Sequence, residues 1–199
     1  MVYAVPALDI PLRLNLHAVQ LSDEQFYRLC VNNPELQLER DRQGRLIIMA
    51  PMGGESGNWE LELGTDVALW NRQSKQGRVF SSSTLFKLPI GSDRSPDVAW
   101  VERSRWDSLT PEQRQKFVPL APDFALELRS PSDSLQTLQD KMQEYLDSGV
   151  RLAWLLNPQD QTVEIYRPGQ DPEVRSLPTV LSGEGVMVGF ELTIDRFPL

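Results

Sequence analysis

Hydrophobic residues recur along the chain at two different periods, which predict helices and strands in a mixed order. Trp59, Leu63, Val67 and Trp70 follow one another at three- and four-residue steps in a proline-free segment, 56–76. This spacing places all four on one face of a helix. The sequence therefore predicts a long amphipathic helix that packs one face on a sheet.

A second helix is expected over 134–147, after a serine suited to capping its first turn. Short apolar runs between turn residues indicate strands. We expect these strands over 97–101, 124–128, 151–156 and 162–166, with shorter ones near Val174, over 186–188 and over 190–194.

The first fifty residues predict a smaller unit of one helix and one hairpin. Ser22 and the acids that follow it open a short helix, which ends by Pro34. The apolar runs 36–39 and 46–49 flank a glycine-containing turn, as expected for a β-hairpin. Between the strands of the main sheet, 103–117 is typical of a polar helical excursion.

This order of elements predicts an α/β (α+β) fold in which helices cover a mixed central sheet. We expect one domain over 1–199, since the chain contains no repeat or long linker. Within it, 1–50 forms an N-terminal arm with the helix and hairpin, 51–169 the core, and 170–199 the C-terminal strands.

Composition narrows the functional classes. Hydrophobic residues make up 40% of the 199 positions, but no apolar run approaches the roughly 20 residues of a membrane-spanning helix. Residues 1–6 lack the basic start and apolar core of a signal peptide, so we expect a cytoplasmic protein. The lone Cys30 and lone His17 argue against a disulfide framework, a cysteine or histidine metal cluster, and a Ser-His pair.

The net charge of −8 argues against a nucleic-acid partner, because such proteins usually present a basic face. The local surface matters more than the total, however. Six cations lie within or beside the candidate motifs: Arg94, Arg103, Arg105, Arg129, Lys141 and Arg151. Solvated faces and ordinary ion pairs are the alternative explanation for them.

Two carboxylates mark the ends of neighbouring predicted strands. Asp97 follows Pro96 at the start of one strand, and Glu127 stands between two leucines near the end of another, thirty residues later. An unpaired charge inside a sheet is costly, so Glu127 needs a partner. A turn position for Asp97, and a structural ion pair of Glu127 with Arg129 or Lys141, are the non-catalytic alternatives.

Together these groups suit a binding site for a divalent cation in an enzyme that hydrolyses phosphodiesters. Mg²⁺ takes oxygen ligands and needs only one or two carboxylates, so we nominate Asp97, Glu127 and the carbonyl of Leu128. Lys141 lies roughly 40° beyond the apolar stripe of its helix and can orient or help to deprotonate a water. Arg129, two residues after Glu127, is expected on the same strand face to bind a phosphate oxygen or a carboxylate.

Acids on the long helix, Glu55, Glu60 and Glu62, could add a ligand, although each also fits an exposed position. Lys141 fits a plain surface cation of an amphipathic helix equally well. Paired acids also occur in glycosidases, but nothing else in the chain indicates a sugar platform.

The motifs as a set resemble one known family. Ser95-Pro96-Asp97, the segment 122–134, Lys141-Met142-Gln143-Glu144-Tyr145 and the segment 149–154 are similar to the bacterial putative restriction endonucleases of the Uma type, within the PD-(D/E)XK nuclease superfamily. The similarity extends over about 21–169. It implies a restriction-endonuclease-like mixed sheet flanked by helices, with an N-terminal extension.

The resemblance also implies site residues and partners. Asp97 matches the acid of the first motif and Glu127 that of the second, whereas Arg129 occupies the last place, where lysine is usual. Lys141 resembles a lysine displaced to the next helix. The implied cofactor is Mg²⁺ or Mn²⁺, the implied substrate is DNA, and a homodimer is left open. An inactive nuclease-fold module for binding or assembly is the second hypothesis.

Overall fold

The computed structural model describes residues 11–16, 18–195 and 197. Within this part of the chain lie five helices and thirteen strands. The helices are α1 (Asp23–Asn32), α2 (Gly54–Ser74), α3 (Arg103–Asp107), α4 (Pro111–Gln115) and α5 (Leu135–Asp147). The strands are β1 (Leu12–Leu14), β2 (Leu38–Arg40), β3 (Leu46–Ile48), β4 (Gly77–Ser81), β5 (Phe86–Lys87), β6 (Asp93–Arg94), β7 (Val98–Glu102), β8 (Phe124–Leu128), β9 (Leu152–Asn157), β10 (Thr162–Tyr166), β11 (Glu173–Ser176), β12 (Thr179–Ser182) and β13 (Glu191–Ile194).

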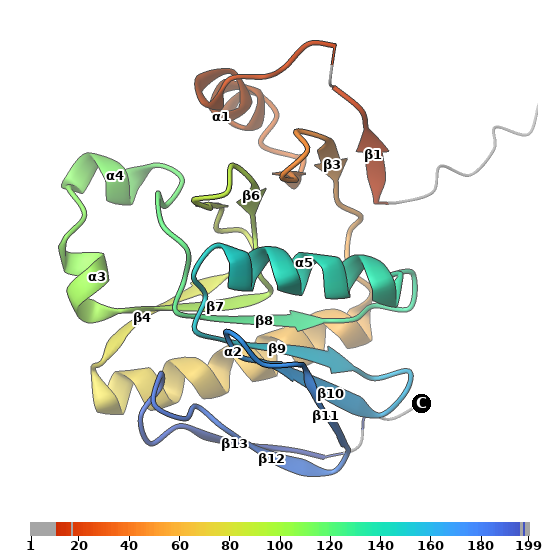
Figure 1. Cartoon of the computed structure of the whole chain (residues 1–199), viewed down its shortest axis with the longest axis vertical. Coiled ribbons are helices and arrows are strands. Elements are labelled where there is room, and N and C mark those ends of the chain that lie inside the picture. Colours follow the sequence, from red (N-terminus) through yellow and green to blue (C-terminus); the bar gives the residue numbers. More distant parts are fainter. Residues whose placement is uncertain (1–10, 17, 196, 198–199) are drawn as a thin grey trace, which may run out of the picture.

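A six-stranded mixed sheet forms the centre of the molecule. Its strand order is β11-β10-β9-β8-β7-β4, with β8 and β9 parallel and the other neighbours antiparallel. Helix α5 crosses one face of this sheet, and α2 with the β12-β13 hairpin covers the other (Figure 1). The expected mixed sheet between helices is confirmed.

Side-chain alternation along β8 explains how the two faces differ. Phe124, Leu126 and Leu128 face the core beneath α2, whereas Ala125 belongs to the core beneath α5. Ala99 and Ala153 on the flanking strands lie in the same α5 core, and such small side chains let the helix approach the sheet closely. The face under α5 is also the one to which residues two positions from these alanines, Asp97 and Glu127, belong.

The N-terminal hairpin belongs to a second sheet. β2 and β3 pair antiparallel as expected, and the sheet order β1-β3-β2-β6-β5 adds two short strands from the segment just before β7. Helix α1 begins with a capping box between Ser22 and Gln25 and buries Phe26 against this sheet. The hairpin thus shares a sheet with two strands of the predicted core, and the first ten residues of the N-terminal arm lie outside the described residues.

Two local expectations are corrected. Residues 186–188 form turns rather than a strand, because the N–H groups of Val186 and Met187 both donate to the Gly183 carbonyl. The partner of β13 is β12 instead. The polar excursion over 103–117 divides into the two short helices α3 and α4, and Thr110 caps the second.

Close approach at the end of α2 requires one glycine. A Cβ atom at Gly77 would lie 2.2 Å from the Val101 carbonyl oxygen and 2.5 Å from the Trp100 ring. Asn71 accepts the Gly77 N–H and the Trp100 indole N–H through its side-chain oxygen, which joins α2 to the sheet.

Among the described helices, none has the length and apolar character needed to cross a bilayer.

Candidate active site

The two nominated acids lie side by side at the same end of two neighbouring strands of the central sheet. β7 and β8 pair with Val98 opposite Leu126 and Ala99 opposite Ala125, so one further step places Asp97 opposite Glu127. Both positions alternate with the alanines beneath α5, so both side chains belong to that face. The antiparallel register is the reason that residues thirty positions apart share one site.

Glu127 is enclosed by two donors from α5. Its side chain is 3% exposed, its carboxylate lies 2.9 Å and 3.0 Å from Lys141 Nζ, and the Tyr145 hydroxyl donates to it at 2.6 Å. Burial raises the pKa of Glu127, and the Lys141 ammonium only partly offsets this effect. The expected partner of this buried acid is therefore Lys141.

Asp97 has no such cationic partner. The backbone N–H of Leu128 donates to its Oδ2 at 2.6 Å, and no lysine or arginine of the described chain forms an ion pair with it. Burial, and then the charge of Glu127, raise the pKa of Asp97 well above its usual value. A cation at this position would relieve both effects.

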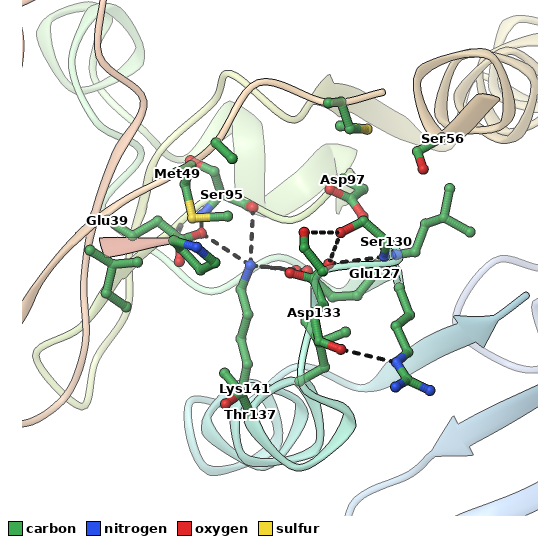
Figure 2. Close-up of a pocket in the computed structure, with 18 of the residues that line it drawn as sticks. Glu39, Met49, Ser56, Ser95, Asp97, Glu127, Ser130, Asp133, Thr137 and Lys141 are labelled. Carbon is green, nitrogen blue, oxygen red and sulfur yellow. Dashed lines mark hydrogen bonds and ion pairs between the residues drawn. The ribbon is translucent and has the colours of Figure 1, made fainter. Parts of the chain in front are cut away.

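Lys141 lies in the middle of a cluster of charged side chains that includes Glu127 and Glu39 (Figure 2). Its ammonium contacts Glu127, Glu39 Oε1 at 3.0 Å and the Ser95 carbonyl at 3.4 Å. Burial alone would lower the pKa of Lys141, but the two carboxylates outweigh it and raise that pKa. The side chain is thus held as an ammonium, which cannot accept a proton from water.

Three further charged residues complete the cluster, and sequence reasoning assigned none of them this role. Glu39 on β2 accepts from Arg94 on β6 at 2.9 Å, and Arg94 in turn contacts Glu144 on α5 at 2.7 Å. All three side chains are buried. Arg94 carried a signal in the sequence through its place beside the Asp97 motif, and Glu144 through its place in the motif that begins at Lys141, whereas Glu39 carried none.

The cluster carries an excess of negative charge. Asp97, Glu127, Glu39 and Glu144 are four carboxylates, whereas Lys141 and Arg94 are the two cations among them. When all are ionised, two negative charges remain uncompensated. A divalent cation at Asp97 and Glu127 would balance them.

The possible metal ligands at this site are few, and all of them are oxygen atoms. Within the described residues, no three histidine, cysteine, aspartate or glutamate side chains converge as a ready metal cage. Two carboxylates with adjacent water nevertheless suit Mg²⁺, which retains several waters and takes oxygen ligands. Leu128 lines the cavity and gives its N–H to Asp97, and the role of its carbonyl as a ligand stays a prediction.

Of the three helix acids, Glu60 lies nearest to the site in electrostatic terms. Its charge contributes to the raised pKa of Asp97, and its Oε2 atom is buried without a hydrogen-bond partner. The other oxygen accepts from the Ser82 hydroxyl at 2.6 Å. Glu55 and Glu62 are exposed, although Glu55 lines the same cavity as Asp97.

Arg129 points to a different neighbourhood from the one expected. Its guanidinium donates to the Asp133 carbonyl at 3.2 Å, to Asn157 Oδ1 at 3.2 Å and to Asp160 Oδ2 at 3.3 Å. β8 ends at Leu128, so strand alternation no longer directs the side chain. Arg129 still lines the cavity wall, and its role toward phosphate stays a prediction.

A cavity of about 860 Å³ opens over these groups. Asp97, Glu127 and Lys141 line it together with Glu39 from the hairpin and Ser56 at the start of α2. The N-terminal sheet and the central sheet therefore form opposite sides of one cavity.

Cys30, the lone cysteine, lies away from the site. Burial raises the pKa of Cys30 to about 11, so its thiol stays protonated beside the Phe26 core. His17 lies outside the described residues.

The chain matches a family model and a solved structure. The model is Uma2, described as "Putative restriction endonuclease", and it matches residues 23–195. The solved structure is described as a putative nuclease belonging to DUF820 from Anabaena variabilis ATCC 29413. It is 22% identical with a TM-score of 0.68, over 80% of this chain and 88% of that chain. At this identity the likeness shows a shared fold, and among curated proteins none matches.

Proposed function

Because the chain belongs to the Uma2 family of putative restriction endonucleases, we propose that it hydrolyses DNA phosphodiester bonds with Mg²⁺ or Mn²⁺ held by Asp97 and Glu127. The observation that carries the proposal is the pairing of these acids across β7 and β8 beside an open cavity, in a cluster whose four carboxylates outnumber its two cations. The carbonyl of Leu128 is the proposed third ligand.

A bound divalent ion supplies charge neutralisation at the phosphate and activation of a water. The protein residues prepare the site for this. Leu128 N–H and the Tyr145 hydroxyl hold one oxygen each of Asp97 and Glu127, so the carboxylates keep their orientation. Preorganised ligands of this kind need little rearrangement during the reaction.

Lys141 acts through its positive charge. Its raised pKa makes it unsuitable as a general base, so the idea that it deprotonates water is replaced by an electrostatic role. The ammonium orients a water or stabilises charge on the phosphoryl oxygens. Arg129, at the cavity wall, is proposed to contact a neighbouring phosphate, for which its planar guanidinium is suited.

Several features favour the second hypothesis, a nuclease-fold module that binds or assembles without cleaving. The chain is acidic overall, and Arg129 is already engaged by Asn157 and Asp160. The Lys141–Glu127 contact is also a complete structural ion pair.

That the protein forms a homodimer and that it is cytoplasmic both stay predictions.

A cleavage assay separates the two hypotheses. Supercoiled plasmid and short single- and double-stranded oligonucleotides are incubated with the protein in Mg²⁺, in Mn²⁺ and in EDTA. We expect metal-dependent cleavage that falls to the no-enzyme background for Glu127→Gln, and by about 100-fold or more for Lys141→Met, which loses an electrostatic stabiliser.

Glu164→Gln is the matched control. Glu164 is also a buried acid, but it accepts from Gln139 and Tyr166 and makes no contact with the cluster. Equal cutting by the wild type and Glu127→Gln would reject the catalytic assignment. DNA binding without cleavage of any form would instead support the module.

A further inference from the structure

Glu39 connects the N-terminal sheet to both halves of the candidate active site. It comes from β2, which belongs to a different sheet from the strands that carry Asp97 and Glu127. Its side chain is only 2% exposed, and its carboxylate contacts Lys141, Arg94 and the Ser95 N–H. Burying a carboxylate costs free energy unless the charge is paired, so packing alone does not explain this position.

One contact of Glu39 fixes the lysine. Lys141 Nζ has three N–H donors, and Glu127, Glu39 and the Ser95 carbonyl surround it. The two carboxylates approach at 2.9 Å and 3.0 Å, so the ammonium lies between them rather than on one of them. Without Glu39, the ammonium would be drawn entirely toward Glu127 and Asp97, where it would compete with a metal ion.

A second contact fixes the strand segment of the other acid. Glu39 Oε1 accepts the Ser95 backbone N–H at 2.9 Å, two residues before Asp97. The other carboxylate oxygen accepts from Arg94 at 2.9 Å, and Arg94 is held from the far side by Glu144. Glu39 thus holds Lys141 and the approach to Asp97 with one carboxylate.

We propose that Glu39 is a positioning residue of the nuclease site, which acts by holding the Lys141 ammonium between two carboxylates and the Ser95 segment in register. This inference rests on the proposed nuclease function. It also makes the N-terminal sheet an integral part of the active site, since β2 contributes Glu39 and β6 contributes Arg94 to the cluster.

The first test measures steady-state cleavage by Glu39→Gln at saturating metal. Loss of a residue that orients site groups typically costs about 10- to 100-fold in activity. We expect a loss of that size in kcat, with KM for DNA little changed because the Glu39 carboxylate is already engaged by Lys141, Arg94 and the Ser95 N–H. In a Lys141→Met background, Glu39→Gln should cause a smaller further loss than it does in the wild type, because the part of its action that passes through the lysine is already gone and only its contact with the Ser95 N–H remains.

Asp93→Asn is the control for folding of the N-terminal sheet. Asp93 is a buried acid of the same sheet, and it pairs with Arg40 next to Glu39 without touching Lys141. A purely structural role predicts similar losses of stability and activity in both variants. Retained kcat in Glu39→Gln, or its full effect in the Lys141→Met background, would overturn the proposal.

A second test does not depend on cleavage. Lysine acetylation followed by mass spectrometry reports the accessibility of Lys141, with the exposed Lys75 and Lys116 as internal references. We expect Lys141 to resist acetylation in the wild type and to react at least several-fold faster in Glu39→Gln. If the wild type cuts no DNA but this increase occurs, the nuclease proposal fails while the positioning by Glu39 stands. An unchanged Lys141 rate would refute the positioning role itself.

Discussion

The backbone N–H of Leu128 donates to the Asp97 carboxylate at 2.6 Å, and this bond joins the end of β8 to the start of β7. It also places Asp97 beside Glu127, where a second carboxylate raises the pKa of the first. The site therefore contains an electrostatic penalty that a bound cation would relieve.

Asp97→Asn should stabilise the metal-free protein at neutral pH. The pKa of Asp97 in the folded state lies well above 3.8, so below that pH the carboxyl is protonated in both states and has no effect on stability. As the pH rises, the unfolded chain ionises first and unfolding is favoured. We expect Asp97→Asn to be more stable by about 1 kcal/mol at pH 7, as is common when a functional site is relaxed.

Urea denaturation in EDTA at pH 7 and near pH 4 measures this difference. The advantage of Asp97→Asn should shrink at the lower pH, because the folded wild-type carboxyl keeps its proton there while the unfolded one is only partly ionised. An advantage that is equal at the two pH values, or a loss of stability at pH 7, would contradict the assignment.

Divalent metal should stabilise the wild type. A ligand that binds only the folded state at 100 times its Kd adds about 2.7 kcal/mol to the free energy of unfolding. We expect Mg²⁺, Mn²⁺ and Ca²⁺ to raise Tm in a concentration-dependent manner, and EDTA to reverse the shift. Asp97→Asn and Glu127→Gln should lose this shift, while Glu164→Gln, remote from the cluster, should retain it.

Lys141→Met should destabilise the fold strongly. It leaves Glu127 and Glu39 buried and without their shared cation. Breaking a buried ion pair from one side typically costs about 3–5 kcal/mol. Denaturation of Lys141→Met and of the double variant Lys141→Met/Glu127→Gln measures the effect, and the double variant should recover part of the loss. A Lys141→Met protein as stable as the wild type would mean that the ion pair is not formed.

Tyr145→Phe should affect both stability and activity. The variant removes the hydroxyl that donates to Glu127 at 2.6 Å while the ring remains in the core under α5. A hydrogen bond to a charged group contributes about 1.5–3 kcal/mol, so we expect a loss of that order in denaturation experiments. Metal affinity, measured by calorimetry, should fall as well, because Glu127 loses one of the hydrogen bonds that fix the orientation of its carboxylate. Unchanged metal affinity would show that Lys141 alone orients the carboxylate.

The sequence by itself determined the parts of the fold that depend on local pattern. The spacing of Trp59, Leu63 and Val67 predicted α2, and the apolar run around Glu127 predicted a buried strand with an acid near its end. Both predictions are confirmed, because helix and strand periods are local properties of the chain. The family resemblance drawn from the motifs is confirmed as well.

Only the tertiary structure decided how the cluster is completed. Glu39 meets Lys141 across 102 positions of sequence, through a hairpin that packs against the rim of another sheet. Its residue type and spacing in the chain contain no trace of that contact. Arg129 turns toward Asn157 and Asp160 because β8 ends one residue earlier, and strand alternation stops there. Local pattern fixes which face a side chain takes within an element, whereas contacts between elements depend on how the whole chain packs.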